Sequence, residues 1–361
     1  MNASPRPVLF RADASTRIGT GHVVRCLALA AALRELGIAS VFVTRDFGVD
    51  VATRIRDAGH AVCVLPRPSE RYARLPDDPA HADWAEINQH VDAGQTLSIT
   101  APTAFGAIIV DSYSFDAQWH DAVGSQLTAP IVVIDDLADR PLSAALIVDH
   151  NYCPDHIRKY AEVAPSSRVL GGPRYALLDP VYALSEPHEI VSDVRSIGIF
   201  MGGVDAAGLS LPIARALRAQ GFEGQIEIAT TSGNAALAEL TEASAATEFS
   251  ILLDAPNLAG FFQRHGLQIG AAGGAVWERL CIGVPTVAAV VAANQREVLL
   301  PLRDLGVVEV VSNEPPDAEE IATVALKLAS ACAHRAAIAQ NARLLVDGRG
   351  AARVAQEIAQ L

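Results

Sequence analysis

Two stretches of the sequence share one layout, and this layout decides the fold class. Residues 8–13 (VLFRAD) run into residues 18–22 (IGTGH), and residues 196–201 (SIGIFM) run into residues 202–205 (GGVD). In both places a short apolar segment, typical of a buried parallel strand, ends in a glycine-containing loop in front of a helical segment. This order is typical of the first unit of a Rossmann-like domain. The chain is therefore predicted to hold two such domains.

The rest of the sequence continues the same alternation of strand and helix. Val- and Ile-rich runs bounded by turn residues predict strands at residues 8–13, 40–45, 61–65, 107–113, 131–136, 145–150, 196–201, 225–231, 249–254, 267–271, 285–291 and 307–311. Ala- and Leu-rich segments predict helices at residues 22–36, 51–58, 116–127, 209–219, 234–242, 276–282 and 295–304. Alternation of this kind predicts an α/β fold with parallel sheets.

The domain boundary is expected in residues 179–193, which carry two prolines and several charges. We predict a first domain over residues 1–180 and a second over residues 181–345. Residues 346–361 are expected to form a helix that packs back on the first domain. Open α/β sheets bind ligands beyond the carboxyl ends of their strands, so both glycine loops are expected to open on one interdomain cleft.

Composition restricts the class of function. The 361 residues are 50% hydrophobic, carry a net charge of -13 and contain no apolar run of the roughly 20 residues that span a bilayer. Clustered positive charge for nucleic acid or an anionic membrane is therefore not expected. The five cysteines lie far apart without metal-ligand spacing. We expect a cytoplasmic protein, a monomer or weak oligomer, whose partner is a small molecule.

The first glycine loop predicts a site for a ligand oxygen. Gly19 and Gly21 precede a helix whose first turn contains His22, and a helix start offers free N–H groups and a positive dipole end. A nicotinamide dinucleotide is the alternative, with Asp46 as the ribose-binding acid. Val24 argues against it, because the dinucleotide fingerprint needs a third small residue there.

His22 is the candidate general base. A helix N-terminus disfavours an imidazolium, so a histidine in that turn is expected to be uncharged and able to accept a proton. The alternative is a polar residue that ends the loop or donates to a bound oxygen.

The second half contains two further glycine-rich helix starts. Gly202 and Gly203 let the backbone approach a diphosphate closely, or else form a structural turn. Gly273 and Gly274 open the next helix, in which the Glu278 carboxylate can accept hydrogen bonds from ribose hydroxyls or complement the helix dipole.

Three carboxylates between residues 135 and 140 suggest either a divalent-metal site or structural hydrogen bonds at a strand end. We favour structural bonds, with Arg140 as the partner of the acidic residues.

Taken together, the motifs resemble a known enzyme family. They are residues 8–13 with 18–22 and Arg25, 135–140, 172–178, 200–205, 270–279, 283–285 and 294–295. This set resembles the UDP-2,4-diacetamido-2,4,6-trideoxy-β-L-altropyranose hydrolases of pseudaminic acid biosynthesis, relatives of the GT-B glycosyltransferases. The resemblance runs from the first strand to about Gly306.

The resemblance implies a GT-B fold in which the C-terminal half binds UDP, with neither a cofactor nor a metal. By position, it implies catalytic or sugar-site roles for His22, Tyr113 and Asn294. It also implies that Glu278 binds the ribose. Substrate contacts are also expected from Asp13, Gly19, Gly21, Arg25, Gly202, Gly203, Gly273, Gly274 and Gln295. The triplets at residues 111–113 and 149–151 depart from the usual family pattern, which leaves the sugar open.

The expected reaction is hydrolysis of a UDP-sugar with inversion at C1. His22 would take a proton from the attacking water, and UDP would leave as a stable anion without a carboxylic acid to protonate it. Such an enzyme would serve flagellin glycosylation or a surface polysaccharide. Two alternatives stay open: a GT-B glycosyltransferase with a UDP-sugar donor, and a nucleotide-sugar sensor without catalysis.

Overall fold

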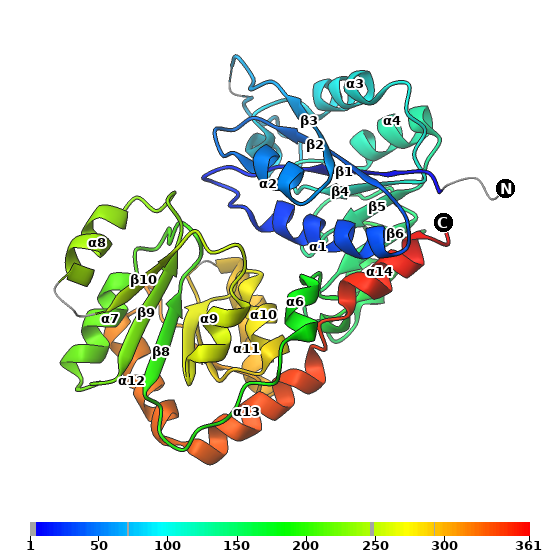
Figure 1. Ribbon diagram of the computed structural model, residues 1–361. Coiled ribbons are helices and arrows are strands. Elements are labelled where there is room, and N and C mark those ends of the chain that lie inside the picture. Colours follow the sequence, from blue (N-terminus) through cyan, green and yellow to red (C-terminus); the bar gives the residue numbers. More distant parts are fainter. Residues whose placement is uncertain (1–4, 71, 246–248, 292) are drawn as a thin grey trace. The chain divides into compact units, whose positions relative to one another are not determined.

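The computed structural model describes residues 5–70, 72–245, 249–291 and 293–361, with the backbone alone at residues 293 and 294. The chain divides into two compact units (Figure 1). Unit 1 comprises residues 1–179 and 349–361, and unit 2 comprises residues 180–348. Among these residues no single helix is long and apolar enough to cross a membrane, and one bent pair, residues 318–330 with 332–358, passes on length and composition only.

Unit 1 is built on a parallel sheet of seven strands in the order β3-β2-β1-β4-β5-β6-β7. The strands are β1 (Val8–Ala12), β2 (Ser40–Arg45), β3 (Ala61–Leu65), β4 (Ala107–Asp111), β5 (Ile131–Ile134), β6 (Leu146–Asp149) and β7 (Arg168–Gly171). Every residue of the central strands β1, β4 and β5 is buried. Because successive side chains of a strand point to opposite sides, both faces of the sheet are covered there. Phe10 joins the core on one face, and Leu9 joins the core on the other.

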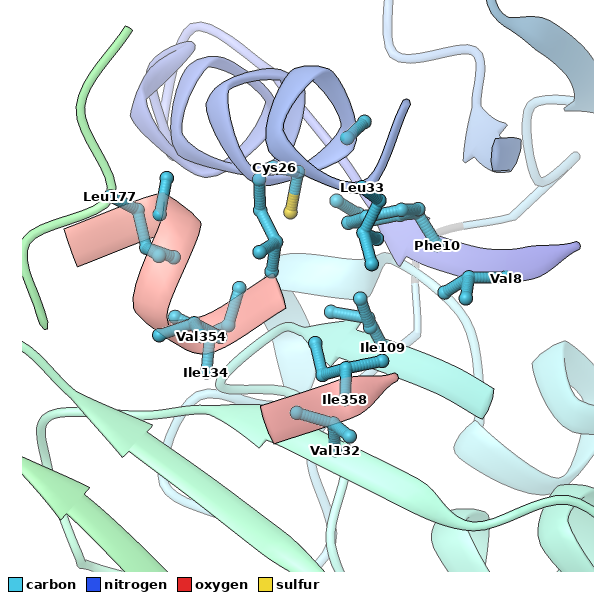
Figure 2. Close-up of a cluster of buried hydrophobic side chains, with 14 of the residues drawn as sticks. Val8, Phe10, Cys26, Leu33, Ile109, Val132, Ile134, Leu177, Val354 and Ile358 are labelled. Carbon is cyan, nitrogen blue, oxygen red and sulfur yellow. The ribbon is translucent and has the colours of Figure 1, made fainter. Parts of the chain in front are cut away.

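Helices cover both faces of this sheet. They are α1 (Gly21–Glu35), α2 (Val51–Asp57), η1 (Ala82–Ala85), α3 (Gln89–Thr100), α4 (Ala117–Leu127), α5 (His156–Tyr160), η2 (Pro173–Tyr175) and α14 (Gly350–Ile358). The last helix, α14, comes from the C-terminal end of the chain. Figure 2 shows its residues Val354 and Ile358 among core side chains of α1 and the sheet, such as Leu33 and Val132.

Unit 2 repeats the plan with a parallel sheet of six strands in the order β10-β9-β8-β11-β12-β13. The strands are β8 (Ser196–Phe200), β9 (Gln225–Thr230), β10 (Ser250–Leu253), β11 (Leu267–Ala271), β12 (Thr286–Ala289) and β13 (Glu309–Val311). The helices are α6 (Pro180–Leu184), α7 (Ser210–Ala219), α8 (Leu237–Ala245), α9 (Ala259–Arg264), α10 (Ala275–Ile282), α11 (Ala293–Asp304), α12 (Ala318–Ser330) and α13 (Cys332–Leu345). Because β8 and β11 are neighbours, the loops that follow them meet at one edge of the sheet.

Several elements were not predicted from the sequence patterns, among them α3, β7 and α6. Helix α3 buries Gln89, Asp92 and Thr96, so it lacks the apolar periodicity of an ordinary core helix. Strand β7 is a four-residue edge strand, too short to stand out from the surrounding loop. The short helix α6 lies inside the segment predicted as a linker.

Candidate active site

The loop after β1 places His22 at the start of helix α1. Gly19 adopts φ +77° and donates its N–H to the Ser15 carbonyl at 2.8 Å, which closes a tight turn before the helix. No side chain caps the helix start at Thr20. His22 is the second residue of α1, and its side chain is 11% exposed. The imidazole therefore lies at an open helix end with one edge accessible.

Asp111, the last residue of β4, holds the imidazole. Strands β1 and β4 pair in parallel with Ala12 opposite Asp111, so their carboxyl ends bring the β1–α1 loop and this carboxylate together. His22 Nδ1 lies 2.5 Å from Asp111 Oδ1. Arg25, one turn further along α1, donates from Nε to Asp111 Oδ2 and from Nη2 to Oδ1, both at 2.6 Å. The predicted residues His22 and Arg25 thus both contact the Asp111 carboxylate, for which no role was predicted from the sequence.

The charge of Asp111 determines the tautomer of His22. Burial would raise the pKa of the Asp111 carboxyl, but the Arg25 guanidinium and then His22 outweigh burial and hold this pKa far below its ordinary value. An ionised carboxylate only accepts hydrogen bonds, so His22 Nδ1 carries a proton and donates it to Asp111. In an uncharged ring, Nε2 is then left with its lone pair. This is the arrangement of a general base held in one orientation by an acid.

Tyr113 forms a second group beside the imidazole. The ring centroids of His22 and Tyr113 lie 4.9 Å apart in an edge-to-face contact. Burial, followed by the negative charge of Asp136, raises the pKa of the Tyr113 hydroxyl well above its ordinary value. The hydroxyl is therefore protonated and donates to Asp136 Oδ1 at 2.5 Å, while Asn151 Nδ2 donates to Asp136 Oδ2 at 2.9 Å. These side chains follow β4, β5 and β6, at the same edge of the sheet.

Two aromatic residues from the loop before α3 extend this group. Ring centroids of His81 and Trp84 lie 6.0 Å and 6.1 Å from that of Tyr113. Arg17, from the β1–α1 loop, lies over Trp84 at 5.5 Å and pairs with Asp83 at 2.8 Å. No role was predicted for these rings from the sequence. Their only signal was a Trp and a His close together in an otherwise irregular loop.

Asp13 lies in a buried ion network on the other side of β1. Its Oδ1 accepts from Arg11 Nη1 at 2.6 Å and from the Arg45 backbone N–H at 2.7 Å. Arg11 and Arg45 also both donate to Asp92 Oδ2, at 2.6 and 2.7 Å. Asp13 is 4% exposed, so its described contacts are structural, and its role toward substrate stays a prediction.

In unit 2 the loop after β8 differs from the predicted diphosphate turn. Asp205 accepts from the backbone N–H groups of Leu209 at 3.1 Å and Ser210 at 2.8 Å, at the start of α7. This helix end therefore already holds a carboxylate, which opposes a second anion. Gly202 and Gly203 precede the carboxylate, and their contact with substrate stays a prediction.

The start of helix α10 is open. Gly274 is its N-cap residue and no side chain caps it. A Cβ added at Gly273 or Gly274 would meet no atom of the described residues within 4 Å. Glu278 lies in the first turn of the same helix. An uncapped helix start of this kind suits an anion, and the contact of these residues with substrate stays a prediction.

The remaining predicted residues lie on or near helix α11. The Gln295 side chain accepts from the Val291 backbone N–H at 3.0 Å, so it closes the loop after β12. The side chain of Asn294 falls outside the described residues, and its catalytic role stays a prediction.

The acidic stretch after β5 forms structural bonds. Arg140 Nη1 donates to Asp135 Oδ1 at 2.7 Å and to Asp139 Oδ1 at 3.0 Å, which confirms the predicted arginine partner. Asp135 Oδ2 also accepts from the backbone N–H of Ala138 at 2.8 Å. Within the described part of the chain, no group of three or more His, Cys, Asp or Glu residues could hold a metal ion.

Comparison with known proteins adds one sequence relative and many similar structures. No family model matches the chain. Over 357 residues it is 23% identical to the spore coat polysaccharide biosynthesis protein SpsG of Bacillus subtilis (strain 168), covering 95% of each chain. It is similar to the spinosyn rhamnosyltransferase SpnG complexed with thymidine diphosphate, with a TM-score of 0.62 and 16% identity over 98% of this chain and 99% of that one. It is also similar to Arabidopsis thaliana UGT89C1 complexed with UDP-L-rhamnose, with a TM-score of 0.68 and 12% identity over 99% and 100%.

These likenesses extend over both units and identify the fold. The chain has a GT-B-like fold of two parallel-sheet α/β units, as the sequence predicted.

Proposed function

We propose that this protein is an inverting nucleotide-sugar enzyme of the glycosyltransferase type, with His22 as its general base and a UDP-sugar as donor. The observation that carries the proposal is the pair of His22 and Asp111 at an open helix start. The pair supplies an uncharged imidazole with a free Nε2 and a carboxylate to stabilise the imidazolium that forms later.

The reaction balances with these groups alone. A hydroxyl of the acceptor attacks C1 of the sugar as Nε2 takes its proton. The bond between C1 and the diphosphate oxygen breaks, and its electron pair leaves with UDP. Attack from the face opposite the leaving group inverts the configuration at C1. The proton stays on His22, and the negative charge of Asp111 stabilises the resulting imidazolium.

The leaving group needs positive potential rather than a proton donor. We assign the diphosphate to the uncapped start of α10, where backbone N–H groups and the positive end of the helix dipole oppose its charge. Glu278, in the first turn of that helix, is the residue we assign to the ribose hydroxyls. No metal is required for this step in our proposal.

Two findings support an acceptor hydroxyl as the nucleophile. Similar structures include a protein named as a rhamnosyltransferase and one complexed with UDP-L-rhamnose. The relative SpsG is named for spore coat polysaccharide biosynthesis, a process that joins sugars to one another. Both fit transfer of a sugar to another hydroxyl.

Water is the second candidate nucleophile. The motif set of residues 8–13, 18–22, 200–205 and 270–279 resembles the UDP-2,4-diacetamido-2,4,6-trideoxy-β-L-altropyranose hydrolases, and this resemblance favours hydrolysis. The His22 and Asp111 pair serves either nucleophile, because each delivers one proton to Nε2. A cytoplasmic location fits both candidates.

Release of UDP from a panel of UDP-sugars, in EDTA and with or without a pool of sugar and alcohol acceptors, tests the proposal. We expect UDP release that depends on an acceptor, with NMR showing an inverted anomeric centre in the product. Rapid release without acceptor would make the protein a hydrolase and would reject the transferase. Tight UDP binding without turnover under any condition would reject both and leave a sensor.

A further inference from the structure

Arg279 is a fully buried cation in unit 2. It belongs to helix α10, and its side chain is 0% exposed. Its Nη2 donates to the Ala271 carbonyl at 2.7 Å. The Nε and Nη1 atoms have no hydrogen-bond partner among the described residues. An arginine in this state is unusual, since burying a charge without a paired carboxylate costs several kcal/mol.

The guanidinium lies beneath the glycine loops of the proposed nucleotide site. A Cβ added at Gly270 would come within 2.3 Å of Arg279 Nη1 and 2.6 Å of the Phe200 carbonyl oxygen. Gly270 and Phe200 pair across β11 and β8, immediately before the loops that carry Gly273 and Gly202. The charge is therefore placed where these two strands end, and the absence of a side chain at Gly270 makes room for it.

The charge persists at neutral pH despite its burial. Burial lowers the pKa of Arg279 to about 10, and the negative charge of Glu278 offsets part of this effect. Because this value is well above 7, the group stays protonated. A positive charge thus lies behind the loops, without a carboxylate paired to it in the described residues.

Arg335 shows how unit 2 buries an arginine that has only a structural role. It is also 0% exposed, but its guanidinium donates to four backbone carbonyls, those of Leu328, Ala329, Val191 and Ser192. Arg335 lies on helix α13, and its bonds link helix α12 to the segment before β8. Arg279 makes one such bond, and two of its nitrogens have no hydrogen-bond partner in the described part of the chain.

We propose that Arg279 is a positioning residue for the diphosphate of a bound nucleotide: its buried charge attracts the phosphates to the α10 start, and its bond to Ala271 fixes the loop that meets them. This inference rests on the nucleotide function proposed above. The anion would add negative charge near a guanidinium that forms no ion pair with the described residues. In water-poor surroundings such a charge acts strongly, because the effective dielectric constant is low.

The test compares Arg279→Met with the matched control Arg335→Met in the full-length chain. Calorimetry would measure the affinity of each variant for UDP and for uridine, which lacks the diphosphate, and thermal unfolding would measure stability. Arg279→Met should weaken UDP binding about tenfold, the effect of one charge-assisted contact. It should leave uridine affinity within about twofold and should not lower the unfolding temperature, since the buried charge itself is costly.

The other variants should behave differently. Arg335→Met should lower the unfolding temperature, because four carbonyls lose their donor, and should leave UDP affinity unchanged. Arg279→Lys keeps the charge and should retain most of the UDP affinity.

Each contrary result has a distinct meaning. Unchanged UDP affinity in Arg279→Met, equal weakening for UDP and uridine, or failure of this variant to fold would overturn the inference and leave the proposed function standing. A wild-type protein that binds neither UDP nor any other nucleoside diphosphate would overturn both.

Discussion

Buried arginines have different partners in the two units. In unit 1, Arg11, Arg45 and Arg140 are each paired with a buried carboxylate. In unit 2, the described bonds of Arg279 and Arg335 go to backbone carbonyls. Unit 1 therefore balances its charges internally and can hold ionisable side chains in fixed positions. Among the described residues of unit 2, neither of these two buried guanidinium groups forms an ion pair with a carboxylate.

The balance of charge in unit 1 explains how the proposed base, His22, is held in one orientation. Asp111 stays ionised because Arg25 lies against it, and an ionised Asp111 requires a proton on His22 Nδ1. The same carboxylate without Arg25 would be a costly buried charge. The proposed function thus assigns acid–base chemistry to unit 1 and binding of the diphosphate to unit 2.

Removal of the base should give the largest effect. His22→Ala should lower kcat by about two to four orders of magnitude, the usual contribution of a general base. Steady-state kinetics would measure this, and calorimetry should show unchanged UDP affinity, because the nucleotide is assigned to unit 2. His90→Ala, at an exposed histidine of α3, is the control. Near-normal turnover of His22→Ala would remove the residue from the base role.

Breaking the ion network of unit 1 should have the largest effect on stability. Asp92→Asn leaves Arg11 and Arg45 without their shared carboxylate, and breaking a buried pair costs about 3–5 kcal/mol. Urea unfolding would measure this loss. Asp193→Asn removes an exposed pair with Arg195 and should change nothing measurable. Equal free energies of unfolding for the two variants would mean that the buried ion network contributes no more stability than an exposed ion pair. This result would contradict the structural role of the Asp92 network.

Loss of the orienting acid should have a smaller effect than loss of the base. Asp111→Asn should lower kcat by a smaller factor than His22→Ala in steady-state kinetics, because the base remains but loses the partner that orients it. The double variant with His22→Ala should be no slower than His22→Ala alone, because the two residues act as a unit. Additive losses in kcat would show that Asp111 acts independently of His22.

The stability of unit 1 should also depend on pH through a buried histidine. His120 Nδ1 accepts from the Ser143 backbone N–H at 3.3 Å, and burial, helped by Arg140, lowers the pKa of His120 from 6.5 to about 3. Between pH 6.5 and 3, His120 binds a proton in the unfolded chain but stays uncharged in the folded chain. The free energy of unfolding should therefore fall by up to about 1.4 kcal/mol per pH unit between pH 6.5 and 3.

The variant His120→Asn tests this dependence. Its side-chain oxygen can replace the Nδ1 acceptor without titrating. Urea unfolding at pH 7.5 and 5.0 should show a smaller drop than in the wild type. An identical drop in both proteins would exclude His120 as a source of the pH dependence.

The ribose contact in unit 2 should give the smallest of these effects. Glu278→Ala should weaken UDP binding about tenfold, as expected for hydrogen bonds to a charged group, while leaving kcat at saturating donor close to normal. Calorimetry with UDP, and with a deoxyribose analogue for which the loss should be reduced, would measure it. If UDP affinity does not change, Glu278 is a structural residue.

Regular patterns in the sequence predicted the strands well, while polar packing was harder to foresee. Buried parallel strands such as β2 and β11 are short and mostly apolar, and their bounds were predicted to the residue. Helix α3 was missed because it buries Asp92 toward Arg11 and Arg45, a contact between residues more than 40 positions apart. No local sequence pattern indicates such a pairing.

The candidate site was predictable only in part, for the same reason. His22 could be selected because a glycine loop and a helix start are local features. Its partner Asp111 depends on which strand pairs with β1, and strand order is not visible in a local motif. The bonds of Asp205 to the start of α7 were likewise not predictable from the glycines before it, which suggest a turn but not the direction of the carboxylate.

The most direct test of the central claim is the tautomer of His22, read from long-range nitrogen–proton NMR correlations of 15N-histidine-labelled protein at neutral pH, with the His22 signal assigned from the His22→Ala spectrum. We predict an uncharged ring with its proton on Nδ1 and a bare Nε2, because Asp111 accepts from Nδ1. A ring protonated on Nε2 alone, or on both nitrogens, would contradict the account.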